Sequence, residues 1–241
     1  MEPSLLRKCQ DNARRAEKLA IQTNSEFLTP AEQISLQDPS ISPIFFGGDG
    51  DCERKMAFFL PSWLEEIHPE EAISAISIVP SFGTPGHRDY LGSVLSLGIR
   101  RECIGDLRIT PEGAYLFCQK NLADYLILNL SHVGGCGVKC RELSLSQMPP
   151  LHREYRAVSF TVQSPRLDAV CAGMFRLSRS AAATQITAGN VQVNYVVCLR
   201  SDSPMHPGDI VTLRGYGKGT LCDFGGTSRK GRTFLEAKIW K

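Results

Sequence analysis

The sequence has no apolar run that approaches the ~20 consecutive apolar residues needed to span a bilayer. Its first 20 residues lack the apolar core of a secretion signal, and they carry Asp11 and Glu17, which argues against a transit peptide. We therefore expect a cytoplasmic protein without a membrane partner, or a plastid protein if a transit peptide has been removed. At 241 residues, the chain can hold one large domain or two to three small ones.

Metal-binding patterns are also lacking. The nine cysteines are an odd number without regular spacing, which favours buried free thiols in a chain without a secretion signal. Cys136 and Cys140 have the spacing of two zinc ligands, but no second pair lies at finger spacing. Asp49, Asp51 and Glu53 alternate as calcium ligands do, but the later ligands of that loop are absent. We expect no bound metal.

Cofactor motifs are missing too. Gly47-Gly48 is not followed by the Gly-Lys-Ser/Thr of a phosphate-binding loop. A methyltransferase would need a glycine-rich loop after a strand, whereas Gly134-Gly135-Cys136-Gly137 follows a predicted helix and residues 215–219 fall in a predicted final hairpin. These absences predict no cofactor and no enzyme activity.

The segment 87–107 groups histidine, arginine and aspartate, as acid–base sites do. No nucleophile, second carboxylate or metal spacing accompanies the group. A structural ion pair is therefore the favoured interpretation, joining Arg101 or Arg88 to Asp106 or Asp89. Arg100 and Arg101 also remain candidates for contacts with RNA phosphates.

Charge is unevenly distributed along the chain. Residues 1–75 carry a net −6, residues 76–163 a net +2 and residues 164–241 a net +6, so the formal total is +2. A basic C-terminal third favours a nucleic-acid partner for that part of the chain. The acidic N-terminal third leaves open a protein-interaction module that binds a basic partner.

The order of predicted elements indicates an α+β protein. Residues 1–70 are predicted to form an N-terminal α/β domain, with helical character up to residue 40, a helix start at Thr29-Pro30 and a hairpin over 45–61. Residues 71–147 read as β-α-β-β-α-β, the order of a ferredoxin-like, RRM-like domain. Residues 148–163 are predicted to be a linker and leading strand, followed by a C-terminal domain over 164–241 with a final hairpin. The six central elements are predicted at 75–80, 88–97, 104–109, 114–118, 120–130 and 138–145.

An RRM binds bases through aromatic side chains on its two central strands. The RNP1 pattern is missing here, and on the predicted central strands only Tyr115 and Phe117 could stack on bases. Both fit equally well as core residues, so the sequence leaves their role open.

The C-terminal stretch 164–194 predicts two short helices, a turn and a strand. Leu167, Val170 and Cys171 share one apolar stripe, and Gly173 is expected to end that helix in the left-handed conformation. Ser178 is predicted to cap a second helix, whose buried residues are expected to be Ala181, Ala182 and Ile186. Backbone N–H groups at the helix ends, together with arginine and serine side chains, would form an anion-binding surface.

The pattern RLDAxxxxxFxLSRSxAxxxIxxGxVxVN from Arg166 to Asn194, followed by Pro207-Gly208-Asp209-Ile210-Val211 and Arg214-Gly215, resembles the S4-type RNA-binding domain. That module is shared by a small-subunit ribosomal protein, several pseudouridine synthases and tyrosyl-tRNA synthetases. The resemblance implies that RNA faces a set of polar side chains in this domain. They are Arg166, Arg176, Ser178, Arg179 and Ser180, with Asn194 and Arg214 on the same side, and Lys218 is added as a further candidate.

Three further motifs precede this domain: Thr29-Pro30-Ala31-Glu32-Gln33, FFGGxxxxERK from Phe45 to Lys55, and HRDYLGSxLxLGIRRExIGDL from His87 to Leu107. Together with the S4-type pattern they resemble the YlmH family along nearly the whole chain. The resemblance implies a non-enzymatic, monomeric protein whose partners are rRNA and tRNA rather than DNA. It also implies a place on the large ribosomal subunit, holding peptidyl-tRNA in rescue or quality control of stalled translation. A link to cell division is implied as well. Asp49 to Cys52 depart from the family's usual residues.

An RNA-modifying enzyme, or an accessory factor that uses an S4-type domain to target rRNA, is the alternative. A pseudouridine synthase would carry that module at its other end, with a larger catalytic domain and an aspartate motif, and neither is found.

Overall fold

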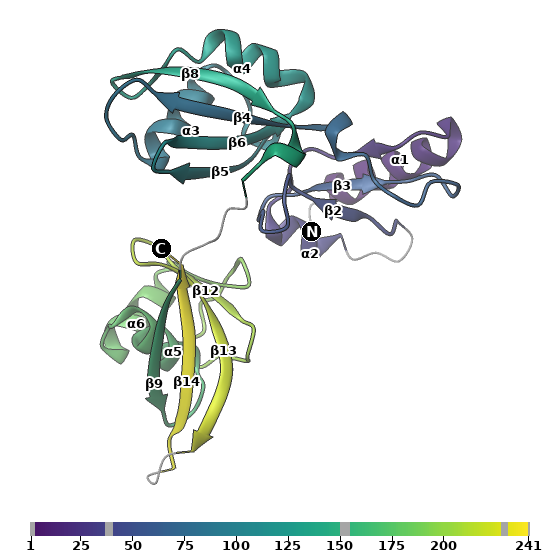
Figure 1. The fold of residues 1–241 in the computed structure, drawn as a ribbon. Coiled ribbons are helices and arrows are strands. Elements are labelled where there is room, and N and C mark those ends of the chain that lie inside the picture. The colour runs from purple at the N-terminus through teal and green to yellow at the C-terminus, as the bar shows by residue number, and fades with distance from the viewer. Residues whose placement is uncertain (1–2, 37–40, 150–154, 228–230, 241) are drawn as a thin grey trace. The chain divides into compact units, whose positions relative to one another are not determined.

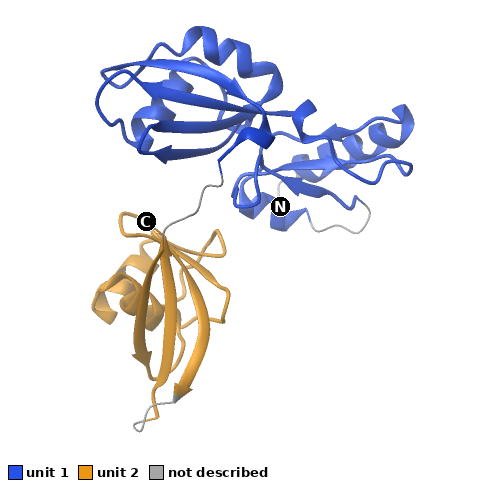
Figure 2. Cartoon of the chain, in the orientation of Figure 1, with its two compact units in different colours: residues 1–150 blue, residues 151–241 orange. Residues whose placement is uncertain are grey.

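The computed structural model describes residues 3–36, 41–149, 155–227 and 231–240. It divides into two compact units, residues 1–150 and residues 151–241 (Figure 2). Residues 150–154 of the predicted linker lie outside the described residues. No helix in the described part of the chain is long and apolar enough to cross a membrane.

The first unit begins with a small α/β part. Its sheet has the order β1-β3-β2, and β3 pairs with β2 as the hairpin predicted over 45–61. Cys9 and Ala16 of α1 pack with Leu28, Leu36 and Phe59 in one core. The elements are α1 (Pro3–Leu19), β1 (Thr23–Asn24), α2 (Pro30–Ser35), β2 (Ile44–Phe46) and β3 (Met56–Phe59).

Helix α2 shows how local sequence sets an element boundary. The side chain of Thr29 accepts a hydrogen bond from the backbone N–H of Glu32, and the backbone N–H of Thr29 donates to the Glu32 carboxylate at 2.7 Å. This capping box satisfies donors that a helix start leaves free, and Pro30 has no N–H to satisfy. The predicted helix start is confirmed.

The second part of the first unit is a five-stranded antiparallel sheet of order β5-β6-β4-β8-β7. Helices α3 and α4 lie on one face (Figure 1), where Tyr90, Val94 and Leu126 pack on Ile76 and Leu116. The elements run β4 (Ile73–Pro80), α3 (His87–Ser96), β5 (Ile104–Thr110), β6 (Gly113–Gln119), α4 (Ala123–Asn129), β7 (His132–Val133) and β8 (Cys136–Leu143). Strand β7 is additional to the six predicted elements, and a 3-10 turn (Lys120–Leu122) forms the start of the second predicted helix.

The second unit is a six-stranded sheet of order β11-β10-β12-β13-β14-β9 with two helices on one face. Strand β9 pairs with β14 along its whole length, so the predicted leading strand belongs to this sheet. The final hairpin is formed by β13 and β14. The elements are β9 (Tyr155–Val162), α5 (Leu167–Phe175), α6 (Arg179–Thr187), β10 (Val191–Val193), β11 (Val196–Val197), β12 (Ile210–Leu213), β13 (Gly217–Thr227) and β14 (Thr233–Trp240).

The prediction that Gly173 ends helix α5 is wrong. The helix continues to Phe175, and Arg176 takes the left-handed conformation with φ 55°. Gly173 lies inside the helix because a Cβ atom there would overlap the ring of Phe160 on β9. The glycine is needed for close helix–sheet packing rather than for the helix end.

The nine cysteines are free, as predicted, and they differ in burial. Burial raises the pKa of Cys9 to about 11 and the pKa of Cys52, Cys118 and Cys171 to about 12. Since the thiolate is the reactive form, we expect a thiol reagent at mildly alkaline pH to leave these four unlabelled in the folded protein and to label the half-buried Cys136, Cys198 and Cys222. Mass spectrometry after pulsed alkylation, with and without denaturant, measures this. Labelling of Cys171 without denaturant would contradict the packed position of α5.

Candidate nucleic-acid interface

Asp168 organises the basic residues at the start of α5. Its carboxylate is 10% exposed and accepts hydrogen bonds from Arg166 Nε at 3.3 Å and from Arg179 Nη2 at 2.6 Å. The backbone N–H of Ala169 also donates to it at 2.9 Å. One buried carboxylate therefore fixes two exposed guanidinium groups from two helices, and part of the charge of each arginine is used within the fold.

The connection between α5 and α6 presents the remaining members of this group. Ser178 caps α6, as predicted, by accepting from the backbone N–H of Ala181 at 3.1 Å, and its hydroxyl lies 3.0 Å from that of Ser180. The exposed side chain of Arg176 has no hydrogen-bond or ion-pair partner among the described residues. Its full positive charge is therefore available to a ligand at the connection between α5 and α6.

The two helix starts differ in their free N–H groups. At α5, the N–H groups of Leu167 and Asp168 donate to the carbonyl oxygens of Ser203 and Ser201, both at 2.9 Å. An anion cannot bind those groups without displacing the loop. The start of α6 is the one of the two that a phosphate can approach.

Asn194 and Arg214 lie at opposite ends of the β10–β12 pair. The backbone N–H of Asn194 donates to Ile210, whereas the backbone N–H of Arg214 donates to Asn190 at the other end. The side chain of Asn194 donates to Asp209 at 2.8 Å and accepts from the N–H of Ile210 at 2.9 Å. This amide holds a turn, while the side chain of Arg214 is exposed and unpaired among the described residues.

Lys218 lies on the sheet face opposite the helices, between two aromatic rings. Its Nζ is 4.8 Å from the ring centroid of Tyr195 and 4.7 Å from that of Trp240. Such contacts hold an ammonium group by cation–π attraction. Lys218 is therefore in a different environment from the arginines at the helix ends.

Arg101 is drawn into the joint between the two parts of the first unit. Its Nη1 donates to the carbonyl oxygens of Ile104 at 2.6 Å and Gly105 at 3.1 Å. Beside it, Arg54 donates from Nε to Ile104 at 3.0 Å and from Nη2 to Phe27 at 2.7 Å. Burial, followed by repulsion from Arg54, lowers the pKa of Arg101 to about 10. Arg101 is thus occupied by backbone carbonyl groups rather than presented to a ligand.

Asp106 completes the joint from strand β5. Its carboxylate accepts the backbone N–H of Glu53 at 2.7 Å and that of Arg54 at 3.0 Å. Nearby, Asp49 forms a 2.6 Å ion pair with Arg108. Arg100, by contrast, is exposed and forms an ion pair with Glu26. Asp49 of the predicted turn, and Arg101 and Asp106 of the predicted Arg/Asp cluster, therefore form part of this joint.

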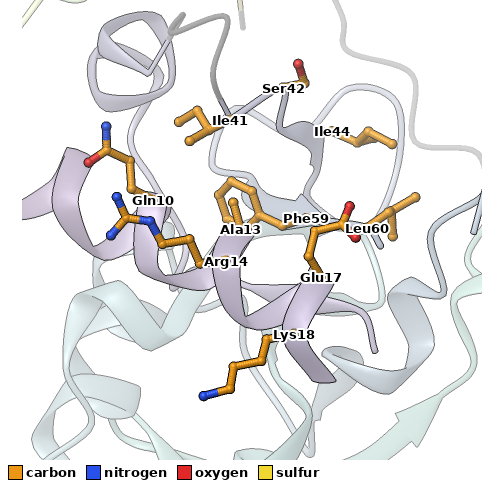
Figure 3. A pocket seen from close by; sticks show the side chains of 10 residues that line it. All are labelled: Gln10, Ala13, Arg14, Glu17, Lys18, Ile41, Ser42, Ile44, Phe59 and Leu60. Carbon is orange, nitrogen blue, oxygen red and sulfur yellow. The ribbon is translucent and has the colours of Figure 1, made fainter. Parts of the chain in front are cut away.

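A groove of about 790 Å³ lies between α1 and the residues around β2 and β3 (Figure 3). Its lining mixes apolar side chains with Arg14, Glu17 and Lys18, and its ten residues include neither histidine nor cysteine. Within the described residues, no group of three or more histidine, cysteine or acidic side chains could hold a metal ion.

Residues 70–147 match a family model described as "Putative RNA-binding domain in YlmH". Ribosome-associated protein quality control protein P2 of Bacillus subtilis (strain 168) is 29% identical over 214 residues, which cover 86% of this chain and 82% of that protein. The chain is similar to the YlmH family in this domain and to a relative along most of its length. A solved YlmH structure, cell division protein ylmH from Streptococcus pneumoniae, has a TM-score of 0.52 at 17% identity and covers 60% of this chain and 92% of that one. This last likeness shows the shared fold.

Two motifs that carry the YlmH resemblance meet in the joint. The Glu53-Arg54-Lys55 motif and the segment from Arg100 to Leu107 are far apart in the sequence, yet Arg54 and Asp106 connect them. Sequence reasoning missed the role of Arg54, although its position in a motif shared with the YlmH family was the available signal. Arg101 was predicted to contact RNA phosphates. Because its guanidinium donates to the backbone carbonyl groups of Ile104 and Gly105, the structure does not present it for that contact.

The ion pair between Arg179 and the buried carboxylate of Asp168 predicts different stabilities for two neighbouring variants. Arg179→Ala should lower the free energy of unfolding by about 1 to 2 kcal/mol, because it removes a charged hydrogen bond from a buried carboxylate. Arg176→Ala should change it by less than about 0.5 kcal/mol, since that side chain has no partner among the described residues. Urea unfolding of both proteins measures the difference, and equal stabilities would show that Asp168 does not depend on Arg179.

Proposed function

We propose that this protein is a non-enzymatic RNA-binding protein of the YlmH family that binds structured rRNA and tRNA on the large ribosomal subunit. It would act there in rescue or quality control of stalled translation, in the compartment that holds the ribosomes. The relative from Bacillus subtilis, named as a ribosome-associated quality control protein, supports this role. The match of residues 70–147 to an RNA-binding domain supports the class of partner.

We further propose that residues 71–147 are an RRM-like domain and residues 164–241 an S4-type domain. The sheet order β5-β6-β4-β8, with α3 and α4 on one face, supports the first assignment. The helix pair α5–α6, followed by β10 and β12, supports the second. These assignments give the chain two domains of RNA-binding type.

The observation that carries the proposal is the exposed basic surface of the second unit. Arg166 and Arg179 are fixed by Asp168, and Arg176 and Arg214 have no partner among the described residues. Cations held on a rigid support bind phosphates of a folded RNA by charge and shape. Arg166 and Arg179 are poor choices for a test, because replacing either one disturbs Asp168.

Arg176→Ala and Arg214→Ala therefore test the surface. We expect each to weaken binding to purified large ribosomal subunits by about threefold to tenfold, and to reduce the slope of log K against log salt by about 1. The measurement is run with and without bound peptidyl-tRNA, which we expect to strengthen binding. Quantitative cosedimentation over a salt series gives both numbers.

Arg156→Ala is the matched control, because it removes one exposed arginine from β9, with β13 and β14 lying between it and β12 in the sheet. It should bind as the unsubstituted protein does. If all three variants lose the same affinity, general charge rather than this surface governs binding. If RNA incubated with the protein gains modified nucleosides, detected by mass spectrometry, the protein is an RNA-modifying enzyme instead.

A further inference from the structure

The central sheet of the first unit has one face that is only half covered. Along β6, Leu116 packs under the helices, while Tyr115 and Phe117 point to the opposite face. At one end of that face, Phe27 and Phe58 of the N-terminal part pack on Phe117, which is fully buried. Beyond Phe117, towards the start of β6, this core stops.

The uncovered half carries a row of side chains that crosses four strands. The register pairs Tyr115 with Arg108 on one side and with Ser77 on the other, and Ser77 pairs in turn with Arg141. Residues in register on neighbouring strands lie about 4.5 to 5.5 Å apart and form one continuous surface. Arg108 is held at the edge of this row by its ion pair with Asp49.

A second row begins next to the first. Val79 pairs with Lys139, and both side chains are exposed on the same face as Tyr115. The side chains of Lys139 and Arg141 have no hydrogen-bond or ion-pair partner among the described residues. The half-face therefore combines a partly exposed aromatic ring, an apolar side chain and two available positive charges.

We propose that this half-face, defined by Ser77, Val79, Tyr115, Lys139 and Arg141, binds a short single-stranded segment of RNA. One base stacks on Tyr115, and the flanking phosphates are neutralised by Lys139 and Arg141. A ring beside unpaired cations suits a single strand, whose bases are free to stack, better than a duplex, whose bases are already stacked. Phe27 and Phe58 cover Phe117, so Tyr115 is the one aromatic ring of the half-face on which a base can stack.

This inference rests on the proposed function for its class of partner, and it adds a separate surface on the first unit. Its test uses the full-length protein and a fluorescently labelled, unstructured oligouridine, with affinity measured by anisotropy over a salt series. The variants are Tyr115→Leu, Tyr115→Phe and the double variant Lys139→Ala/Arg141→Ala. Arg7→Ala, on α1, is the matched control because it removes an exposed arginine without a partner from the same unit.

Tyr115→Leu should weaken oligouridine binding about tenfold without changing its salt dependence, because it removes stacking and no charge. Tyr115→Phe should retain binding, since the Tyr115 hydroxyl has no hydrogen bond among the described residues. The double variant should reduce the salt slope by about 1.4, which is the value for two phosphate contacts on a single strand. Arg7→Ala should change neither the affinity nor the slope.

Unchanged binding by Tyr115→Leu, or a slope change for Arg7→Ala equal to half that of the double variant, would overturn the inference. Circular dichroism confirms that each variant is folded, and the double variant removes only exposed side chains. Binding of the same proteins to large ribosomal subunits separates the two proposals. Normal oligouridine binding by Arg176→Ala and Arg214→Ala, together with loss by Tyr115→Leu, supports the half-face even if the subunit interaction fails.

Discussion

Replacing Phe117 by alanine is expected to lower the free energy of unfolding of the first unit by about 3 to 5 kcal/mol. The ring is fully buried between the sheet and the N-terminal part, beside Phe27, Met56 and Phe58. Gly48 lies directly against it, with φ 118°, and a Cβ atom at that position would overlap the ring. The substitution therefore leaves a cavity that the surrounding backbone cannot easily fill.

Thermal unfolding by circular dichroism measures this loss, and peptide-resolved hydrogen exchange assigns it to the first unit. Tyr115→Leu is the control on the same strand and face, and it should cost less than about 1.5 kcal/mol because Tyr115 is half-exposed. If Phe117→Ala is as stable as the control, Phe117 is not a core residue. It would then return to the candidates for base stacking.

Arg54→Ala is expected to have the next largest effect, about 3 kcal/mol. The guanidinium donates to the carbonyl oxygens of Ile104 and Phe27, and a third, longer bond of 3.4 Å reaches Arg101. Removing it leaves the carbonyl oxygen of Phe27 without a donor among the described residues and takes one of two arginine donors from that of Ile104, at the joint between the N-terminal part and the central sheet. Burial lowers the pKa of Arg54, and that cost of burying the charge is offset by the bonds it makes.

Urea unfolding measures the effect, with Arg100→Ala as the matched control. Arg100 is exposed and contributes only a surface ion pair with Glu26, so its loss should destabilise the protein far less than the loss of Arg54. Arg54→Lys should also be destabilising. The planar guanidinium reaches several separate carbonyl groups at once, whereas the compact ammonium group of lysine does not. An Arg54→Ala protein as stable as Arg100→Ala would show that the joint is held mainly by its apolar contacts.

Local elements were predicted well where neighbouring residues decide the structure. The capping box at Thr29, the strand over Tyr155–Val162 and the cap of α6 at Ser178 agree with the structure. The error at Gly173 had a tertiary cause. A glycine inside a helix looks like a helix end until the ring of Phe160 on β9 is seen to occupy the space of its Cβ.

For the candidate RNA-binding residues too, part of the placement was predicted from the sequence and part was visible only in the tertiary structure. Their types and spacing indicated cations and hydroxyl groups at helix ends, and the structure places Arg166, Arg176 and Arg179 there. It also shows that Arg101 is committed to carbonyl groups and that Asn194 holds a turn. No periodicity distinguishes an arginine that faces a ligand from one that faces the backbone of a distant segment.

The sequence by itself determined the α+β character, the order of the elements and the basic C-terminal third, because these depend on residues close together in the chain. Only the tertiary structure decided between Tyr115 and Phe117. The two side chains point to the same face of β6, and their difference arises because Phe27, Met56 and Phe58 pack over Phe117 and leave Tyr115 uncovered. Burial depends on contacts between distant segments, and a strand pattern records only which face a side chain occupies.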